Sequence, residues 1–216
     1  MTTPERYEEW LDFYFGRTGD RHAAWSLYWG FSAPPALCAD LFAATLDRSG
    51  SDLDAFTDGE VAVGLDALLF GNLGDMPHKL FGTGVTEPQR LAILRSFLPL
   101  YRDCLARRSP PVLGHLDEGK GHPLEYPTYM LWDVTPFDAM ARKDEARTDV
   151  LLGVLDAALR LPNAACVESA LHGLGHWSGP TRPRAVATID GWLASRPEVR
   201  PELFHYARAA RTGCIR

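Results

Sequence analysis

Apolar side chains recur every three or four residues along most of the chain, which is the spacing of amphipathic α-helices. The first such segment begins at Thr2 and runs to about Phe15, and two more begin at Asp20 and at Pro34, the latter ending near Asp47. Apolar and polar residues nowhere alternate for longer than about five positions, so strands are not expected. The pattern predicts an all-α fold.

Two capping boxes mark further helix starts. In Thr57 with Glu60, and again in Thr86 with Gln89, a Thr hydroxyl can accept from the N–H three residues on while the longer side chain reaches back. The second box precedes a long predicted helix, which ends near Arg107–Arg108 and contains Pro99. Because proline lacks an N–H and its ring clashes with the preceding turn, we expect it to kink or divide that helix.

Residues 109–142 differ in character from the rest, since they carry five prolines and a cluster of aromatic side chains. We interpret this segment as an irregular insertion with one short helix. Its residues Tyr129 and Trp132 have two possible roles. Aromatic side chains most often cover the core, which is the better interpretation here, but in an irregular segment they can also anchor a partner protein.

The C-terminal part of the chain has a regular organisation. Helices are predicted at 144–161, 163–177, 182–195 and 199–212. Paired helices with short turns are typical of an α-solenoid, in which each layer buries its face against its neighbours. We therefore predict one all-α domain over residues 1–216, with about nine to eleven helices. Its parts are N-terminal helices in 1–108, the insertion in 109–142, and the regular C-terminal helices in 143–216.

A family resemblance supports this organisation. The stretch ESALHGLGHW, the polar break SGPTRPR, the helix AVATIDGWLAS and the stretch RPELFHYARAARTG lie within residues 160–213. This segment resembles the terminal layers of bacterial HEAT-like helical-repeat proteins. The resemblance implies a binding or scaffolding role, and small helical immunity proteins, which neutralise a cognate toxin by binding it, are similar in kind.

The charge of the chain is uneven. The formal net charge is −6, but residues 1–60 hold eleven acids and four bases, which is −7, so the remaining residues sum to +1. An acidic N-terminal part disfavours nucleic acid as a partner and suits a basic protein, although a solvated face is an equally good interpretation. The chain has no apolar run long enough for a membrane helix and no secretory pattern at its start, so we expect a cytoplasmic protein without a membrane partner.

The segment 163–177 carries the most specific set of polar side chains. Glu168, His172 and His176 follow one another at intervals of four residues, and on a helical wheel they lie nearly opposite the aliphatic stripe. We expect this face to be polar and presented outward or toward a concave surface, where it can bind a partner. Gly173 and Gly175, which weaken a helix, favour close packing more than catalysis.

The same three side chains also permit a metal site, because two histidines four residues apart on a helix can bind one ion together with a carboxylate. Such a site needs a further ligand, for which the loop His115–His122 offers a histidine, but the HExxH pattern is missing. No serine has the context of a nucleophile. We therefore predict a protein-binding module with no catalytic residue and no cofactor. The alternatives are a metal-dependent enzyme that uses Glu168, His172 and His176, and a scaffold subunit of a larger assembly.

Overall fold

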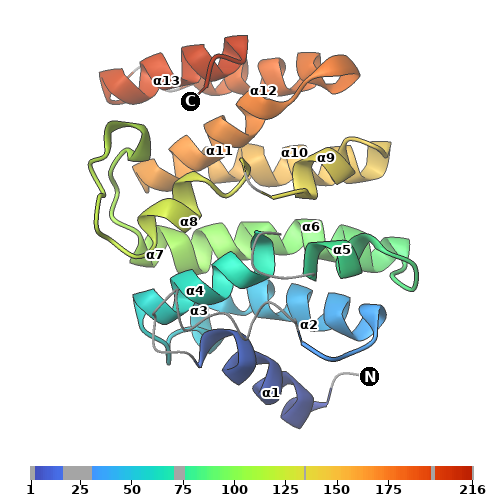
Figure 1. Cartoon of the computed structure of the whole chain (residues 1–216). Helices are drawn as coiled ribbons and strands as arrows, with labels where there is room; N and C mark the ends of the chain where they lie inside the picture. The colour runs from blue at the N-terminus through green and yellow to red at the C-terminus, as the bar shows by residue number, and fades with distance from the viewer. Residues whose placement is uncertain (1–2, 17–30, 71–75, 134, 196–197, 216) are drawn as a thin grey trace.

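The computed structural model describes residues 3–16, 31–70, 76–133, 135–195 and 198–215, which form helices joined by turns and loops, with no strand among them (Figure 1). The all-α prediction is confirmed for this part of the chain. The helix predicted from Asp20 lies outside the described residues.

The helical segments in chain order are α1 (Pro4–Phe15), α2 (Pro35–Asp47), α3 (Ser49–Asp52), α4 (Asp58–Leu69), α5 (Met76–Phe81), α6 (Glu87–Pro99), the π-helix η2 (Leu100–Leu105), α7 (Ala106–Arg108), the 3₁₀-helix η3 (Gly114–Leu116), α8 (Glu125–Tyr129), α9 (Phe137–Ala141), α10 (Glu145–Ala158), α11 (Ala164–His176), the 3₁₀-helix η4 (Gly179–Thr181), α12 (Arg182–Ser195) and α13 (Pro201–Thr212).

The predicted caps form. The α1 helix is capped by Thr3, one residue later than the sequence predicted. In the first capping box the Thr57 N–H donates to the Glu60 carboxylate at 2.8 Å, and the Thr57 hydroxyl accepts from the Glu60 N–H at 3.3 Å. In the second, the Thr86 N–H donates to Gln89 Oε1 at 3.0 Å. Local hydrogen bonds therefore fix the starts of α4 and α6.

Pro99 divides the long helix, as expected. The α6 helix ends at Pro99, the chain continues as the π-helix Leu100–Leu105, and the short α7 follows. A proline ring cannot occupy the regular α-helical ladder without displacing the carbonyl four residues before it, and a wider turn accommodates that displacement. The π-helix carries Tyr101, whose fully buried side chain faces α11 and bonds to it.

The helices stack in chain order, with α1 at one end and α12 and α13 at the other (Figure 1). In one row α2 packs on α6, α6 on α10, and α10 on α12. In a second row α1 packs on α4, α4 on α8, α8 on α11, and α11 on α13. The buried apolar side chains form one connected cluster that runs through both rows.

The segment 109–142 contributes more structure than predicted. It contains the two short helices α8 and α9 and the turn η3, where one short helix was expected, and this is one reason why the helical segments outnumber the predicted nine to eleven. Several of its apolar side chains are fully buried, among them Leu113, Leu124 and Phe137, whereas Leu116 and Tyr126 are exposed. The segment thus belongs to the core of the second row, because α8 fills the space between α4 and α11.

The four C-terminal helices are confirmed as α10, α11, α12 and α13, with ends that differ from the predicted ones by up to three residues. These helices can be recognised in the sequence by the spacing of their apolar residues. The N-caps Asp144 and Asn163 mark the starts of α10 and α11.

Candidate functional site

The start of α11 is tied to the preceding layer by Asn163. Its side-chain oxygen accepts the N–H of Ala165 at 2.9 Å, which caps the helix, while its amide nitrogen donates to the carbonyls of Ser109 at 2.9 Å and Ala106 at 3.2 Å. One side chain therefore fixes the position of α11 relative to the end of α7.

Gly173 and Gly175 allow two neighbours to approach α11 closely. A Cβ atom at Gly173 would lie 2.7 Å from ring atoms of Trp132, and one at Gly175 would lie 2.9 Å from side-chain atoms of Ile215. Both distances are shorter than a van der Waals contact allows. The structure thus agrees with the packing role predicted for these glycines.

The prediction that Glu168 and His172 lie on an outward polar face is wrong. Glu168 is 0 % exposed and His172 is 2 % exposed, whereas His176 is partly exposed. The helical wheel assumes that a helix is covered on one side. The α11 helix is covered on two, because α8 packs on one part of its surface and α13 on another.

Glu168 holds the loop that precedes α8. Its carboxylate accepts the Gly114 N–H at 2.6 Å and the His115 N–H at 3.3 Å, and it also contacts His115 Nδ1. Burial raises the pKa of Glu168, and the hydrogen bonds from His115 and Gly114 oppose that rise. The carboxylate is thus occupied by the loop and makes no pair with His172.

His172 is held between two tyrosines. Its Nδ1 lies 2.6 Å from the hydroxyl of Tyr206 on α13, and its ring meets the Tyr129 ring edge to face at 4.9 Å. Its Nε2 is buried and has no hydrogen-bond partner among the described residues. Burial is the main cause that lowers the pKa of His172 to about 4, so the imidazole is neutral at physiological pH.

The lowered pKa of His172 predicts that acid destabilises the fold. The unfolded chain takes up a proton at His172 near pH 6.5 and the folded chain does so near pH 4, so protonation favours the unfolded state and stability falls as the pH drops below 6.5. Between pH 7 and pH 5 this group should remove about 2 kcal/mol from the free energy of unfolding. Urea unfolding at both pH values, in buffer with a metal chelator, measures the loss. In His172→Gln the loss of unfolding free energy between pH 7 and pH 5 should be smaller by about 2 kcal/mol. In the control His205→Gln, which alters an exposed histidine, the loss should stay as in wild type. An unchanged loss in His172→Gln would contradict the lowered pKa of His172.

Asp133, which is not part of α11, lies close to the two histidines of that helix. Its Oδ1 lies 3.0 Å from His176 Nε2, and one ligand atom from each of Asp133, His172 and His176 lies within 4.8 Å of the others. No motif in the sequence points to Asp133, which lies in the connection between α8 and α9. The structure therefore brings together His172, His176 and Asp133, and it separates Glu168 from them.

Trp132, the second aromatic candidate, lies in the core. It is 1 % exposed, and its indole N–H donates to the Tyr101 hydroxyl at 2.6 Å, which in turn lies 2.7 Å from the Ser169 hydroxyl. The interpretation of Trp132 as an anchor for a partner is therefore wrong, because Phe97 of α6 and the surface of α11 at Gly173 pack against it. Tyr129 is half-buried, with its hydroxyl 3.4 Å from that of Tyr206.

The polar groups of the 115–122 loop are used separately. His115 contacts Glu168, while Glu118 accepts the Leu113 N–H at 2.9 Å and forms an ion pair with Arg200. His122 Nδ1 accepts a backbone N–H at 3.3 Å. The loop is thus held to α11 through His115 and to the start of α13 through Glu118. Its polar side chains do not gather into a common binding site.

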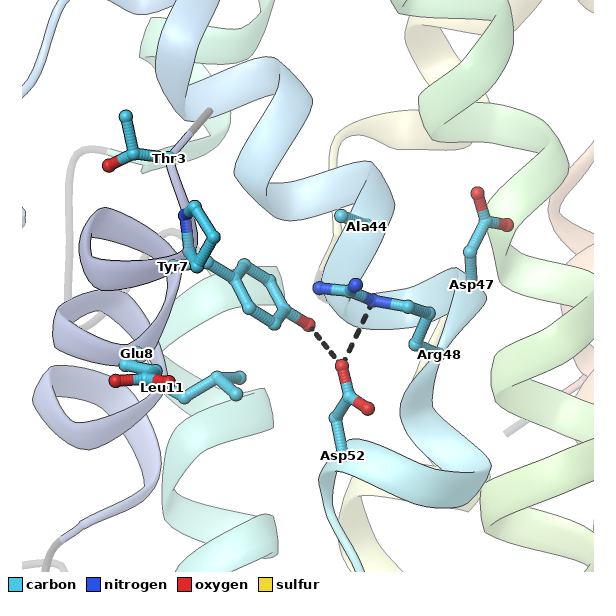
Figure 2. A pocket seen from close by; sticks show the side chains of 9 residues that line it. Thr3, Tyr7, Glu8, Leu11, Ala44, Asp47, Arg48 and Asp52 are labelled. Carbon is cyan, nitrogen blue, oxygen red and sulfur yellow. Dashed lines mark hydrogen bonds and ion pairs between the residues drawn. The ribbon is translucent and has the colours of Figure 1, made fainter. Parts of the chain in front are cut away.

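A groove at the opposite end of the molecule was not predicted. We call it the α1–α3 groove; it has a volume of about 720 Å³. Figure 2 shows Tyr7 and Leu11 on α1 pointing toward α2, where Ala44 lies on the near side and Asp47 stands farther from α1. Its lining residues are Thr3, Pro4, Tyr7, Glu8, Leu11, Ala44, Asp47, Arg48 and Asp52.

One wall of the groove is braced internally. The Tyr7 hydroxyl donates to Asp52 Oδ2 at 2.9 Å, the Arg48 guanidinium lies 3.0 Å from the same oxygen, and that guanidinium stacks 4.1 Å from the centre of the Tyr7 ring. These contacts join α1 to Arg48, which follows α2, and to Asp52, the last residue of α3 (Figure 2). The sequence held no signal for them, because the partners lie far apart along the chain.

The rest of the groove is acidic. Its lining includes three carboxylates and one guanidinium, a net charge of −2. Arg48 is paired with Asp52, whereas the exposed carboxylates of Glu8 and Asp47 have no hydrogen-bond or ion-pair partner among the described residues. Although Asp47 is an exposed residue, partial burial of its carboxylate raises its pKa.

In the part of the chain that the structure describes, no helix has both the length and the apolar character needed to cross a membrane. No protein-family model, no curated protein and no solved structure matches the chain.

Proposed function

We propose that this protein works by binding another protein, and that the α1–α3 groove receives a basic segment of that partner. The observation that carries the proposal is the combination, in one groove, of an apolar lining with two carboxylates that have no partner in the part of the chain that the structure describes. An acidic groove attracts a basic partner and steers its approach. The net charge of −7 over residues 1–60 extends the same attraction beyond the groove.

The shape and chemistry of the groove suit an arginine or lysine side chain. Such a side chain has an aliphatic stem, which can lie on Leu11 and Ala44, and a cationic end, which can reach Glu8 or Asp47. The partly desolvated carboxylate of Asp47 would gain most from this contact, because an ion pair strengthens as water is excluded.

The helical arrangement supports a binding role. The rows α2–α6–α10–α12 and α1–α4–α8–α11–α13 each pack in chain order, as the helices of a HEAT-like solenoid do. We propose that the chain is such an array. Solenoids use their extended faces as partner surfaces. The helices α1 and α2, whose residues line the groove, lie at the N-terminal end of the stack (Figure 1).

Within this proposal the partner is a toxin that the protein neutralises. Inhibition by occlusion needs surface complementarity and no catalytic group, which fits a charged groove built for a basic segment. A partner that is toxic when produced alone and harmless when produced together with this protein would support the immunity role. A harmless partner would favour the scaffold role and leave the binding proposal in place.

Capture experiments with matched variants test the groove. The double variant Glu8→Gln/Asp47→Asn removes two negative charges from the groove, and Glu145→Gln/Glu198→Gln removes two exposed ones elsewhere. Proteins from the native host are captured on wild type and on both variants at low salt and identified by mass spectrometry. We expect a basic protein that is retained by wild type and by the control, and reduced about tenfold on the groove variant, equivalent to about 1.4 kcal/mol.

The salt dependence of the purified complex adds a second criterion. Affinity should fall as ionic strength rises, because the exposed carboxylates are screened, and the fall should be shallower for the groove variant than for wild type. Equal capture on all three baits, or a partner that binds the groove variant as tightly as wild type, would refute the proposal.

A further inference from the structure

We propose that Asp133, His172 and His176 form a binding site for one divalent transition-metal ion of the zinc class. Their ligand atoms lie within 4.8 Å of one another. Two imidazoles and one carboxylate suit zinc, iron(II) and related ions better than calcium or magnesium, which prefer oxygen ligands alone. The ligands come from α11 and from the connection after α8, so the site is independent of the α1–α3 groove.

His172 is prepared to bind through Nε2. Its Nδ1 is engaged by the Tyr206 hydroxyl at 2.6 Å, which leaves Nε2, buried and without a partner among the described residues, as the free ring atom. An unpartnered buried polar atom is unfavourable unless something else satisfies it. A cation beside His176 and Asp133 would do so. The lowered pKa of His172 supports this role, because a metal ligand must be the neutral imidazole.

The contact between His176 and Asp133 also fits two ligands of one ion. Their nearest atoms are 3.0 Å apart, yet His176 Nε2 makes no hydrogen bond in the described structure, so the approach lacks the alignment of a hydrogen bond. Neighbouring ligands around a tetrahedral zinc lie about 3.3 Å apart, given metal–ligand distances of about 2.0 Å. The half-exposed Asp133 side chain can rotate to close the remaining gap.

Tyr206 acts as a positioning residue in this site. Its hydroxyl fixes the His172 ring, and it lies 3.4 Å from the Tyr129 hydroxyl, so two elements hold the ligand in place. Metal-bound histidines characteristically use their second nitrogen in this way. Three protein ligands leave a fourth position for water or another small ligand, which can enter beside the partly exposed His176.

Calorimetric titration of the full chain, purified without a histidine tag and treated with chelator, tests the site with Zn²⁺ as the probe. We expect one equivalent of Zn²⁺ per chain, little response to Mg²⁺, and visible absorption typical of four-coordinate Co²⁺ when that ion is substituted. Asp133→Asn and His176→Ala should each weaken Zn²⁺ binding by at least about tenfold. Tyr206→Phe should weaken it by about 10- to 100-fold, as loss of a group behind a metal ligand does.

Two controls separate loss of the metal site from nonspecific binding and from unfolding. His205→Ala removes an exposed histidine on α13 and should bind Zn²⁺ as wild type does. Circular dichroism and thermal unfolding without metal show whether each variant folds, and Asp133→Asn, which alters a partly exposed side chain, remains informative if a histidine variant does not. Absence of stoichiometric binding by wild type, or equal affinity in folded Asp133→Asn, would overturn the proposal.

Discussion

Glu168→Ala should lower the free energy of unfolding by about 3–5 kcal/mol, because each buried donor left without an acceptor costs about 1–3 kcal/mol and the lost side-chain volume adds a cavity. The carboxylate is 0 % exposed and accepts the N–H groups of Gly114 and His115 while contacting the His115 ring. Truncation leaves these donors without an acceptor and opens a cavity beneath the loop. Urea unfolding followed by circular dichroism measures the change.

A comparison of two further variants separates hydrogen bonding from packing. Glu168→Gln keeps the volume and one acceptor oxygen, so we expect a smaller loss than for alanine. Glu202→Ala removes an exposed carboxylate at the start of α13 and should leave stability nearly unchanged. A loss below about 1 kcal/mol in Glu168→Ala would mean that the carboxylate does not hold the loop.

Gly173→Ala should destabilise the fold by about 3 kcal/mol, the upper part of the range for overpacking a core. The new Cβ would lie 2.7 Å from the Trp132 ring, which is fully buried and held by its hydrogen bond to Tyr101, so neither side can move without disturbing the core. This outcome is opposite in sign to helix propensity, because alanine favours a helix by about 1 kcal/mol over glycine.

Gly153→Ala is the matched control for this substitution. Gly153 lies within α10, is exposed, and would have no atom within 4 Å of an added Cβ. We expect this variant to gain about 0.5–1 kcal/mol from propensity alone. The midpoints of thermal unfolding of both variants should therefore move in opposite directions. Equal shifts would show that Gly173 is not required for the approach of Trp132.

The features that the sequence predicted correctly depend on neighbours in the chain. The Thr57 capping box, the division at Pro99 and the start of α11 at Asn163 each arise from interactions within a few residues, so composition and spacing reveal them. The close-packing role of Gly173 was predictable for the same reason, because an interior glycine weakens a helix unless packing requires it.

The errors arose where tertiary packing decides the outcome. A helical wheel placed Glu168 opposite the aliphatic stripe and therefore outside, but the turn at Gly114 covers that face. Asp133 contacts His176, and Tyr7 contacts Asp52, although the partners lie far apart in the sequence. No sequence motif predicts such contacts. Polar side chains on a helix covered by two neighbours are buried together with their partners, and a single sequence does not name those partners.

Binding of a basic side chain of the partner protein in the α1–α3 groove can be measured by a double-mutant cycle. Asp47→Asn in this protein is combined with neutral substitutions of each basic residue in the partner segment, and affinities are measured by calorimetry at low salt. The proposal predicts a coupling energy of about 1.5 kcal/mol or more between Asp47 and one arginine or lysine. Coupling below about 0.5 kcal/mol for every basic residue tested would contradict it.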